Sequence, residues 1–288
     1  MIAADSPGVP HARPRATSFE ELAVQSDAEM DVALGAALIA KDVYGSLDVP
    51  ALLAKFDAIA LPPQTGRLTA VENAARLMKH LYGELGFRGN EEAYYDPKNS
   101  LLPDVLDRRT GIPISLALVY CEVARRAGID ASGVGFPGHF LVRIERSAAA
   151  GEEPGALLVD PFFGGKVLDQ EALQKLLRRA AGPNEALRPE YLAAASPRAI
   201  LVRMLANLKS IYVSRGDHAR AHLALDRVVS LTPDSSAALR ERGSIAAKLG
   251  AVEAARADLT RVLELDPAAE DAKAIRTQLA ALSAKPLN

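Results

Sequence analysis

His139 and Asp160 are the two side chains whose types and spacing first indicate chemistry. An apolar pattern that alternates over 140–144 and a second apolar stretch over 156–160 predict two strands joined by a loop. If the turn is centred near residues 149 and 150, facing residues have numbers that add to about 299, so His139 faces Asp160. A carboxylate that accepts from an imidazole N–H fixes the tautomer of the ring and raises its basicity. The pair therefore predicts a general base and its orienting acid.

Two residues of the predicted helix over 114–127 could supply the nucleophile that such a base would activate. Ser115 lies near the helix start, where a hydroxyl usually caps free backbone N–H groups, although His139 could activate it as a nucleophile. Cys121, the only cysteine in the chain, lies six residues further, in the middle of the helix. The helix dipole favours a thiolate only within the first turn, and burial raises the pKa of a thiol, so Cys121 is predicted to be a core residue.

The elements that would position these residues predict an α+β fold. Helical patterns fill the chain from residue 18 to about 128, and a turn-rich run over 133–138 precedes the strands of a small antiparallel sheet. We assign residues 18–197 to this first, mostly helical domain. Residues 1–17 hold three prolines among small and polar side chains and no apolar period, which predicts a flexible tail.

The last third of the chain contains an internal repeat with a spacing of 34 residues. Six pairs of similar residues follow this spacing: Gly216 and Gly250, Ala221 and Ala255, Leu225 and Leu259, Val228 and Val262, Leu231 and Leu265, and Pro233 and Pro267. The period is that of tetratricopeptide repeats, in which each unit is a pair of helices. Residues 198–288 are therefore predicted to form an all-α domain, with repeats at 202–235 and 236–269 and a capping helix at 270–284.

Four ordered blocks of the first domain resemble the bacterial SirB-type, transglutaminase-like family, whose members commonly carry tetratricopeptide repeats at their C-termini. The blocks are Tyr95–Ser100, Asp107–Ser115, Gly135–Arg143 and Asp160–Gly165. The wider transglutaminase and papain-like superfamily places a cysteine at the start of a central helix, followed by His and then Asp on later strands. His139 and Asp160 match that order, whereas Pro113 occupies the position expected for the cysteine. The resemblance implies a transglutaminase-like fold that lacks the thiol.

Two functions of different classes follow from these features. The first is a non-catalytic protein-interaction or scaffold protein with a regulatory role in bacteria, which holds a protein or peptide partner through the repeats or through the site at His139. The second is an acyl-transfer or amide-hydrolysing enzyme in which His139 is the base and Asp160 orients it, with Ser115 or Cys121 as the nucleophile. The absence of a cysteine at the position expected for the nucleophile favours the non-catalytic interaction protein.

Composition and charge exclude other classes of protein. A net charge of −2 supplies no positive field for nucleic acid, and the longest apolar runs, over 32–40 and 112–121, are shorter than the ~18 residues of a membrane span. A single cysteine and an acidic residue near the N-terminus predict a cytoplasmic protein. His218, His222 and Asp226 share a helix face that is predicted to face solvent, so we predict no metal or cofactor.

Overall fold

The structure is a computed structural model that describes residues 16–62 and 66–283. The helices that precede the repeats are α1 (Phe19–Ala23), α2 (Val32–Val43), α3 (Val49–Ala58), α4 (Ala70–Met78), α5 (Leu102–Arg108), α6 (Pro113–Arg126) and α7 (Gln170–Ala181). A π-helix, η1 (Lys79–Glu84), continues α4, and three short 3-10 helices are η2 (Pro97–Asn99), η3 (Ala148–Ala150) and η4 (Pro189–Leu192). The helices of the repeats are α8 (Pro197–Ser214), α9 (His218–Leu231), α10 (Ser236–Lys248), α11 (Val252–Leu265) and α12 (Ala272–Ser283).

Helix α6 forms the centre of the first part because its sequence is apolar on nearly every side. It begins with Pro113, whose fixed φ and missing N–H suit the first helical position, and Gly128 follows its end with a φ of +73°. Strands β3 (Ala131–Val134) and β4 (Leu141–Glu145) pack against it, as do helices α2 to α5. The observed helix agrees with the predicted central helix to within one residue at each end.

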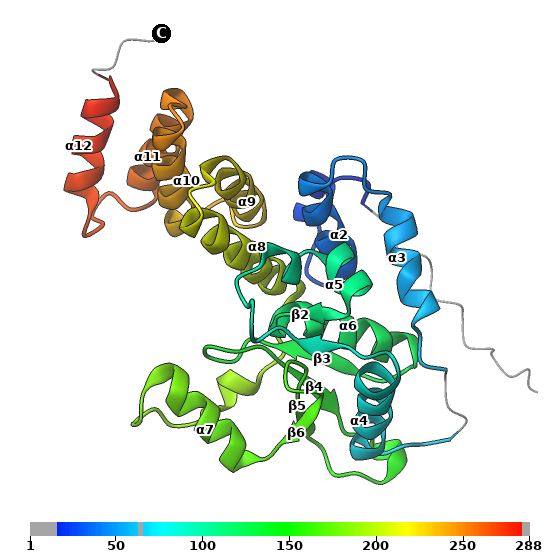
Figure 1. The fold of residues 1–288 in the computed structure, drawn as a ribbon. Helices are drawn as coiled ribbons and strands as arrows, with labels where there is room; N and C mark the ends of the chain where they lie inside the picture. Colours follow the sequence, from blue (N-terminus) through cyan, green and yellow to red (C-terminus); the bar gives the residue numbers. More distant parts are fainter. Residues whose placement is uncertain (1–15, 63–65, 284–288) are drawn as a thin grey trace, which may run out of the picture.

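An antiparallel sheet of strands β3, β4, β5 (Ala156–Asp160) and β6 (Lys166–Leu168) follows α6 in the chain, and its strands lie in sequence order. On one face, Val142 and Val159 join the core around α6. On the other face, Leu141 and Leu158 pack in a second cluster with Leu173 and Leu177 of α7. The predicted α+β fold with a small antiparallel sheet is confirmed (Figure 1).

The first strand of this sheet was not predicted, because its sequence contains a serine and a glycine. Residues 131–134 pair with β4, although the run that starts at residue 133 was predicted to be a turn. A Cβ atom built on Gly133 would lie 2.7 Å from Cε1 of Phe140, so this strand position has no room for a side chain.

The register of the hairpin also differs from the prediction. Val142 faces Val159, so facing residues have numbers that add to 301, a shift of two from the value expected. The loop between β4 and β5 holds the turn η3 and Gly151, whose φ is +76°, and its centre therefore lies later in the chain than residues 149 and 150. The even shift keeps every side chain on its predicted face of the sheet.

Helices α8 to α11 form two antiparallel pairs, and α12 follows them at the far end of the molecule (Figure 1). Ala221 and Ala255, which are 34 residues apart, are both fully buried where the helices of each pair touch. The predicted tetratricopeptide array and its terminal helix are therefore present in the structure.

The first helix pair, α8 and α9, packs on the rest of the chain. The side chain of Leu201 in α8 lies against Gly35 in α2. In α9, the guanidinium of Arg227 forms two hydrogen bonds with the Asp42 carboxylate, at 2.7 and 2.9 Å, and also contacts Glu20. Helices α10 to α12 extend away from this junction (Figure 1). The surface that remains open on the repeats therefore belongs mainly to the later helices.

None of the helices within residues 16–62 and 66–283 combines the length and the apolar character needed to cross a membrane.

The predicted flexible tail over 1–17 lies outside the described residues except for its last two. Of these, Ala16 is buried, and the backbone N–H of Thr17 donates to Glu21 at 2.7 Å. The tail therefore stays a prediction for residues 1–15.

Candidate functional site

The structure brings His139 and Asp160 into direct contact. Nε2 of His139 lies 3.0 Å from Oδ1 and 2.9 Å from Oδ2 of Asp160, and both side chains are buried. In the observed register Asp160 is opposite Leu141 rather than His139, so the imidazole reaches a diagonal neighbour. The contact that the sequence predicted is therefore present, and the roles of the two groups in chemistry stay a prediction.

Backbone groups complete the hydrogen bonding of the Asp160 carboxylate. Its Oδ1 accepts from the N–H of Phe162 at 2.9 Å and from the N–H of Phe163 at 3.2 Å. When the carboxylate is ionised it can only accept, so Nε2 of His139 carries the shared proton. The other ring nitrogen, Nδ1, forms no hydrogen bond within residues 16–62 and 66–283. In the neutral ring, Nδ1 therefore carries the lone pair.

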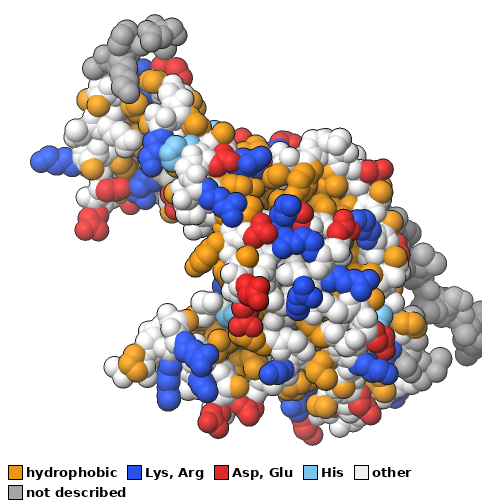
Figure 2. All heavy atoms as spheres, in the orientation of Figure 1, with side chains coloured by type: hydrophobic (Ala, Val, Ile, Leu, Met, Phe, Trp, Pro, Cys, Tyr) orange, Lys and Arg blue, Asp and Glu red, His pale blue; other side chains and the backbone are white. Residues whose placement is uncertain are grey.

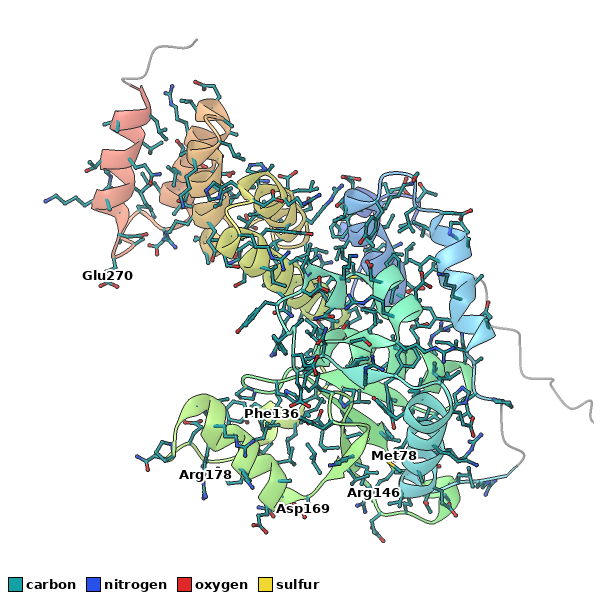
Figure 3. All side chains as sticks on the ribbon, viewed as in Figure 1. Met78, Phe136, Arg146, Asp169, Arg178 and Glu270 are labelled. Atoms are coloured by element: carbon teal, nitrogen blue, oxygen red, sulfur yellow. The ribbon has the colours of Figure 1, made fainter. Side chains whose placement is uncertain are left out.

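A turn and an arginine from the repeat region position His139. The backbone N–H of His139 donates to the carbonyl of Phe136 at 3.0 Å, which closes the turn before β4. Nη2 of Arg203, in α8, donates to the His139 carbonyl at 2.6 Å, and its guanidinium lies over the Phe140 ring. Figure 3 labels Phe136, which packs in the apolar cluster between the sheet and α7. The first repeat helix therefore contributes directly to the site.

Ser115 stabilises the start of α6. Its hydroxyl donates to the carbonyl of Asn99 at 2.6 Å and accepts from the backbone N–H of Ile112 at 3.0 Å, and the residue is 1% exposed. The second bond satisfies the backbone N–H of Ile112, the residue that caps the start of α6, and the first joins the hydroxyl to the segment before α5. In the described part of the chain no hydrogen bond joins Ser115 to His139, so its predicted role as a nucleophile gains no support from the geometry.

Two glycines lie along the contacts that connect Ser115 with His139. Gly89 and Gly111 are partners in a short parallel ladder between β1 (Arg88–Gly89) and β2 (Thr110–Gly111). A Cβ on Gly111 would lie 2.6 Å from Oγ of Ser115, and a Cβ on Gly89 would lie 2.6 Å from the Phe162 carbonyl. The Phe162 ring in turn contacts the His139 ring, with centroids 6.2 Å apart. Strands β1 and β2 and the Phe162 ring therefore lie along the line of contacts from Ser115 to His139.

The close approach at Gly89 leads to a prediction about stability. Gly89→Ala is expected to lower the free energy of unfolding by about 1–3 kcal/mol, because the new methyl group meets the Phe162 backbone and cannot be relieved by a side-chain rotation. Gly45→Ala is the matched control, since no atom lies within 4 Å of its Cβ position. Urea denaturation measures both. Equal stability of the two variants would contradict the packing described at Gly89.

Cys121 lies in the middle of α6, where it packs against the core and lines a cavity that does not include His139. Its side chain is partly buried. Burial, followed by the neighbouring Glu122 carboxylate, raises the pKa of the thiol to about 12. The thiol therefore stays protonated at neutral pH, which is the behaviour of a structural cysteine.

Residues with the ligand types of a metal site do not cluster in the structure. Within residues 16–62 and 66–283 there is no group of three His, Cys, Asp or Glu side chains that could hold a metal ion. Asp226, one of the three residues on the repeat helix face considered above, accepts from Arg242 at 2.6 Å.

A run of aromatic rings, which was not predicted from the sequence, begins at His139. Tyr95 contacts Tyr94, Tyr94 contacts Phe162, and Phe162 contacts Phe163, with ring centroids 5.0 to 5.9 Å apart. Phe163 is stacked on the His139 ring, with centroids 6.2 Å apart. The signal was present in the sequence, because these residues form its only two adjacent aromatic pairs. We call Tyr94, Tyr95, Phe162 and Phe163 the aromatic cluster.

A central helix, an antiparallel sheet and a buried His–Asp pair beside the sheet define a transglutaminase-like domain. The family model described as the transglutaminase-like superfamily matches residues 49–206, and a tetratricopeptide repeat model matches residues 208–280. Because the first match covers more than half of the chain, the chain belongs to the transglutaminase-like superfamily.

Its bacterial relatives include UPF0162 proteins. One from Xylella fastidiosa (strain 9a5c) is 39% identical over 279 residues, which are 92% of this chain and 94% of that protein. One from Pseudomonas aeruginosa is 36% identical over 199 residues, 69% of this chain and 70% of that protein. F-box only protein 21 of Mus musculus is 33% identical over 159 residues, 54% of this chain and 24% of that protein. No solved structure matches. The narrower resemblance to SirB-type proteins stays a prediction.

Proposed function

We propose that the chain is a non-catalytic protein-interaction protein of the cytoplasm, built on a transglutaminase-like domain. The observation that carries the proposal is found at the start of α6, where the transglutaminase-like superfamily places its nucleophile. No free nucleophile is observed there in the described part of the chain. Pro113 occupies the expected position, and the Ser115 hydroxyl is engaged by Asn99 and Ile112. Cys121 lines a different cavity and its thiol pKa is about 12. The His139–Asp160 pair then serves recognition and structure.

The aromatic cluster supports a binding role for the site. Tyr95, Phe163 and Tyr94 are 71%, 44% and 38% exposed, and they are the exposed large aromatic side chains of the described residues. Contiguous exposed rings mark interaction sites, and Tyr is among the residues that dominate binding energy at interfaces. Two arginines of the first repeat helix lie beside the rings: Arg203, which holds the His139 carbonyl, and Arg215, which donates to the Tyr95 carbonyl at 3.1 Å.

The shape of the surface fits an extended partner. The space-filling view is hollowed between α7 and the repeat helices, with hydrophobic side chains at the inner end of the hollow (Figure 2). The repeats themselves offer α10 to α12, since α8 and α9 pack on the first part. A protein or peptide partner could therefore contact the aromatic cluster and the later repeat helices together.

One observation favours the second candidate, an enzyme of acyl transfer or amide hydrolysis. Asp160 orients the imidazole through Nε2 and leaves Nδ1 without a hydrogen bond in the described part of the chain, which is the arrangement of a general base. The candidate would need Ser115 or Cys121 to approach that nitrogen.

Activity measurements separate the two candidates. We expect the wild-type chain to release no more product than His139→Ala when each is given glutamine-containing peptides with a primary amine, or activated amides and esters. The physical reason is that, in the described part of the chain, the Ser115 hydroxyl is bonded to Asn99 and Ile112 and the Cys121 thiol is protonated at neutral pH, so neither is activated by His139. Circular dichroism confirms that both chains are folded. Turnover by the wild-type chain that disappears in His139→Ala would contradict the non-catalytic proposal and establish the enzyme.

A binding measurement tests the proposed surface directly. A stoichiometric partner captured by the full chain from bacterial lysate should bind Tyr95→Ala/Phe163→Ala about 10- to 100-fold more weakly, because truncating aromatic anchors typically costs more than 1 kcal/mol each. Val24→Ala/Val71→Ala is the control, since both side chains are exposed hydrophobics outside the aromatic cluster. An equal loss for both double variants would show that the aromatic cluster has no special role.

A further inference from the structure

A cavity of about 860 Å³ lies beside α6, apart from the His139 site. Its walls come from α6, the start of α2, β3 and the start of α8. Phe140 lines the cavity, whereas His139 is not part of its lining. The volume falls within the range of roughly 300–1,000 Å³ that is usual for sites of small molecules.

The inner surface of the cavity is apolar. Met30, Leu34, Ala117, Leu118 and Phe140 all line it and are all buried. A hydrocarbon body placed against these side chains would lose water on both partners, which gives roughly 25 cal/mol for each Å² of apolar surface. The interior of the cavity therefore suits the apolar part of a ligand.

Carboxylates determine the charge that the cavity accepts. Arg125 is the basic residue of its lining, and that guanidinium already pairs with Glu122, with Nη2 and Oε2 2.7 Å apart. Glu29, Asp31 and Asp130 also line the cavity, and the Asp31 carboxylate acts electrostatically on Arg125 as well. Asp31 accepts one backbone hydrogen bond, from Leu34 at 3.0 Å. The lining thus holds four carboxylates, Glu29, Asp31, Glu122 and Asp130, and one guanidinium, Arg125, and this excess of negative charge favours a positively charged ligand group.

We propose that this cavity binds an organic cation with an apolar body. The ammonium group lies at Asp31 and Asp130, and the apolar part lies against Leu118 and Phe140. No residue of the His139–Asp160 pair or of the aromatic cluster takes part, so the inference does not depend on the proposed function. An organic anion of the same shape meets the same carboxylates and is repelled.

Isothermal titration calorimetry of the full chain tests the proposal with three probes of one chain length. We expect hexyltrimethylammonium to bind, and hexanoate and hexanol to bind at least roughly tenfold more weakly. Asp31→Asn/Asp130→Asn should lower the affinity for hexyltrimethylammonium roughly tenfold, which is the effect of losing two partly exposed ion pairs. Asparagine at position 31 can still cap α2, so the fold is retained.

Two further variants complete the test. Cys121→Phe places a ring in the cavity and should abolish binding of the cation. Glu253→Gln/Asp266→Asn removes one charge from the first turn of α11 and one from the residue that follows α11; neither residue lines the cavity, so binding should be unchanged. Thermal unfolding reports whether each variant is folded. Equal binding of hexanoate and hexyltrimethylammonium would overturn the proposal. Undiminished binding of hexyltrimethylammonium to Asp31→Asn/Asp130→Asn would also overturn it. Neither result depends on whether Cys121→Phe folds.

Discussion

Asp160→Ala is expected to lower the free energy of unfolding by about 3–5 kcal/mol, because each buried donor that loses its acceptor costs roughly 1–3 kcal/mol. The carboxylate is 3% exposed and accepts from Nε2 of His139 and from the backbone N–H groups of Phe162 and Phe163. Removing it leaves the buried N–H groups of His139 and Phe162, and the partly buried N–H of Phe163, without an acceptor. Chemical denaturation measures the loss, and Glu91→Ala, at an exposed position, is the control.

Asp160→Asn separates the loss of charge from the loss of the acceptor. In the structure, Oδ1 of Asp160 alone receives both backbone N–H groups and also lies 3.0 Å from Nε2 of His139. An asparagine oxygen can keep the two bonds from the backbone N–H groups, so the variant should be more stable than Asp160→Ala. Its amide NH₂ then faces the imidazole, which should shift the ring toward the tautomer protonated on Nδ1. Nitrogen NMR of the histidine ring detects that shift. Equal stability of the alanine and asparagine variants would show that the hydrogen bonds to Asp160 matter little.

The parts of the fold that depend on regular spacing could be predicted from the sequence. The 34-residue repeat predicted the helix pairs because each tetratricopeptide unit has to bury the same small residues, such as Ala221 and Ala255. The alternation around Phe140 predicted which face of each strand is buried, since the period of a strand is two. Both inferences use local patterns that tertiary contacts reinforce.

Features that depend on contacts distant in the chain could not be predicted. β3 was missed because Gly133 is a strand residue only where the Phe140 ring fills the space of its side chain. The register was shifted because the turn in the loop after β4 has no strong signal before Gly151. The contact of Arg203 with the His139 carbonyl joins residues 64 positions apart, and no spacing within the sequence indicates it.

The pair of His139 and Asp160 was predicted through an incorrect register, and the reason is physical. His139 precedes β4 in a turn, so its side chain is not restricted to the partner that strand pairing would give it. The imidazole is long enough to reach a diagonal neighbour. The order of histidine and aspartate along the chain was therefore a better guide than the assumed turn position.

Cys121 is expected to react with thiol reagents roughly a thousandfold more slowly in the folded chain than in the urea-unfolded chain at pH 8. Only the thiolate reacts, and burial together with Glu122 raises the pKa of this thiol to about 12, against about 8.5 for a free cysteine. Between about pH 8.5 and pH 12 the Cys121 thiol keeps its proton in the folded chain and loses it in the unfolded chain. The free energy of unfolding should therefore fall as the pH rises through this range.

The rate of labelling as a function of pH measures this directly, because Cys121 is the only thiol in the chain. Between pH 8 and pH 11 the rate for the folded protein should rise about tenfold per pH unit, in proportion to the thiolate fraction, while circular dichroism shows that the fold is intact. The unfolded chain should instead reach a plateau above about pH 9. Rapid labelling of the folded chain at pH 7, with a midpoint below pH 8, would mean that the thiol is activated. That result would contradict the structural role of Cys121 and would favour the acyl-transfer enzyme over the binding protein.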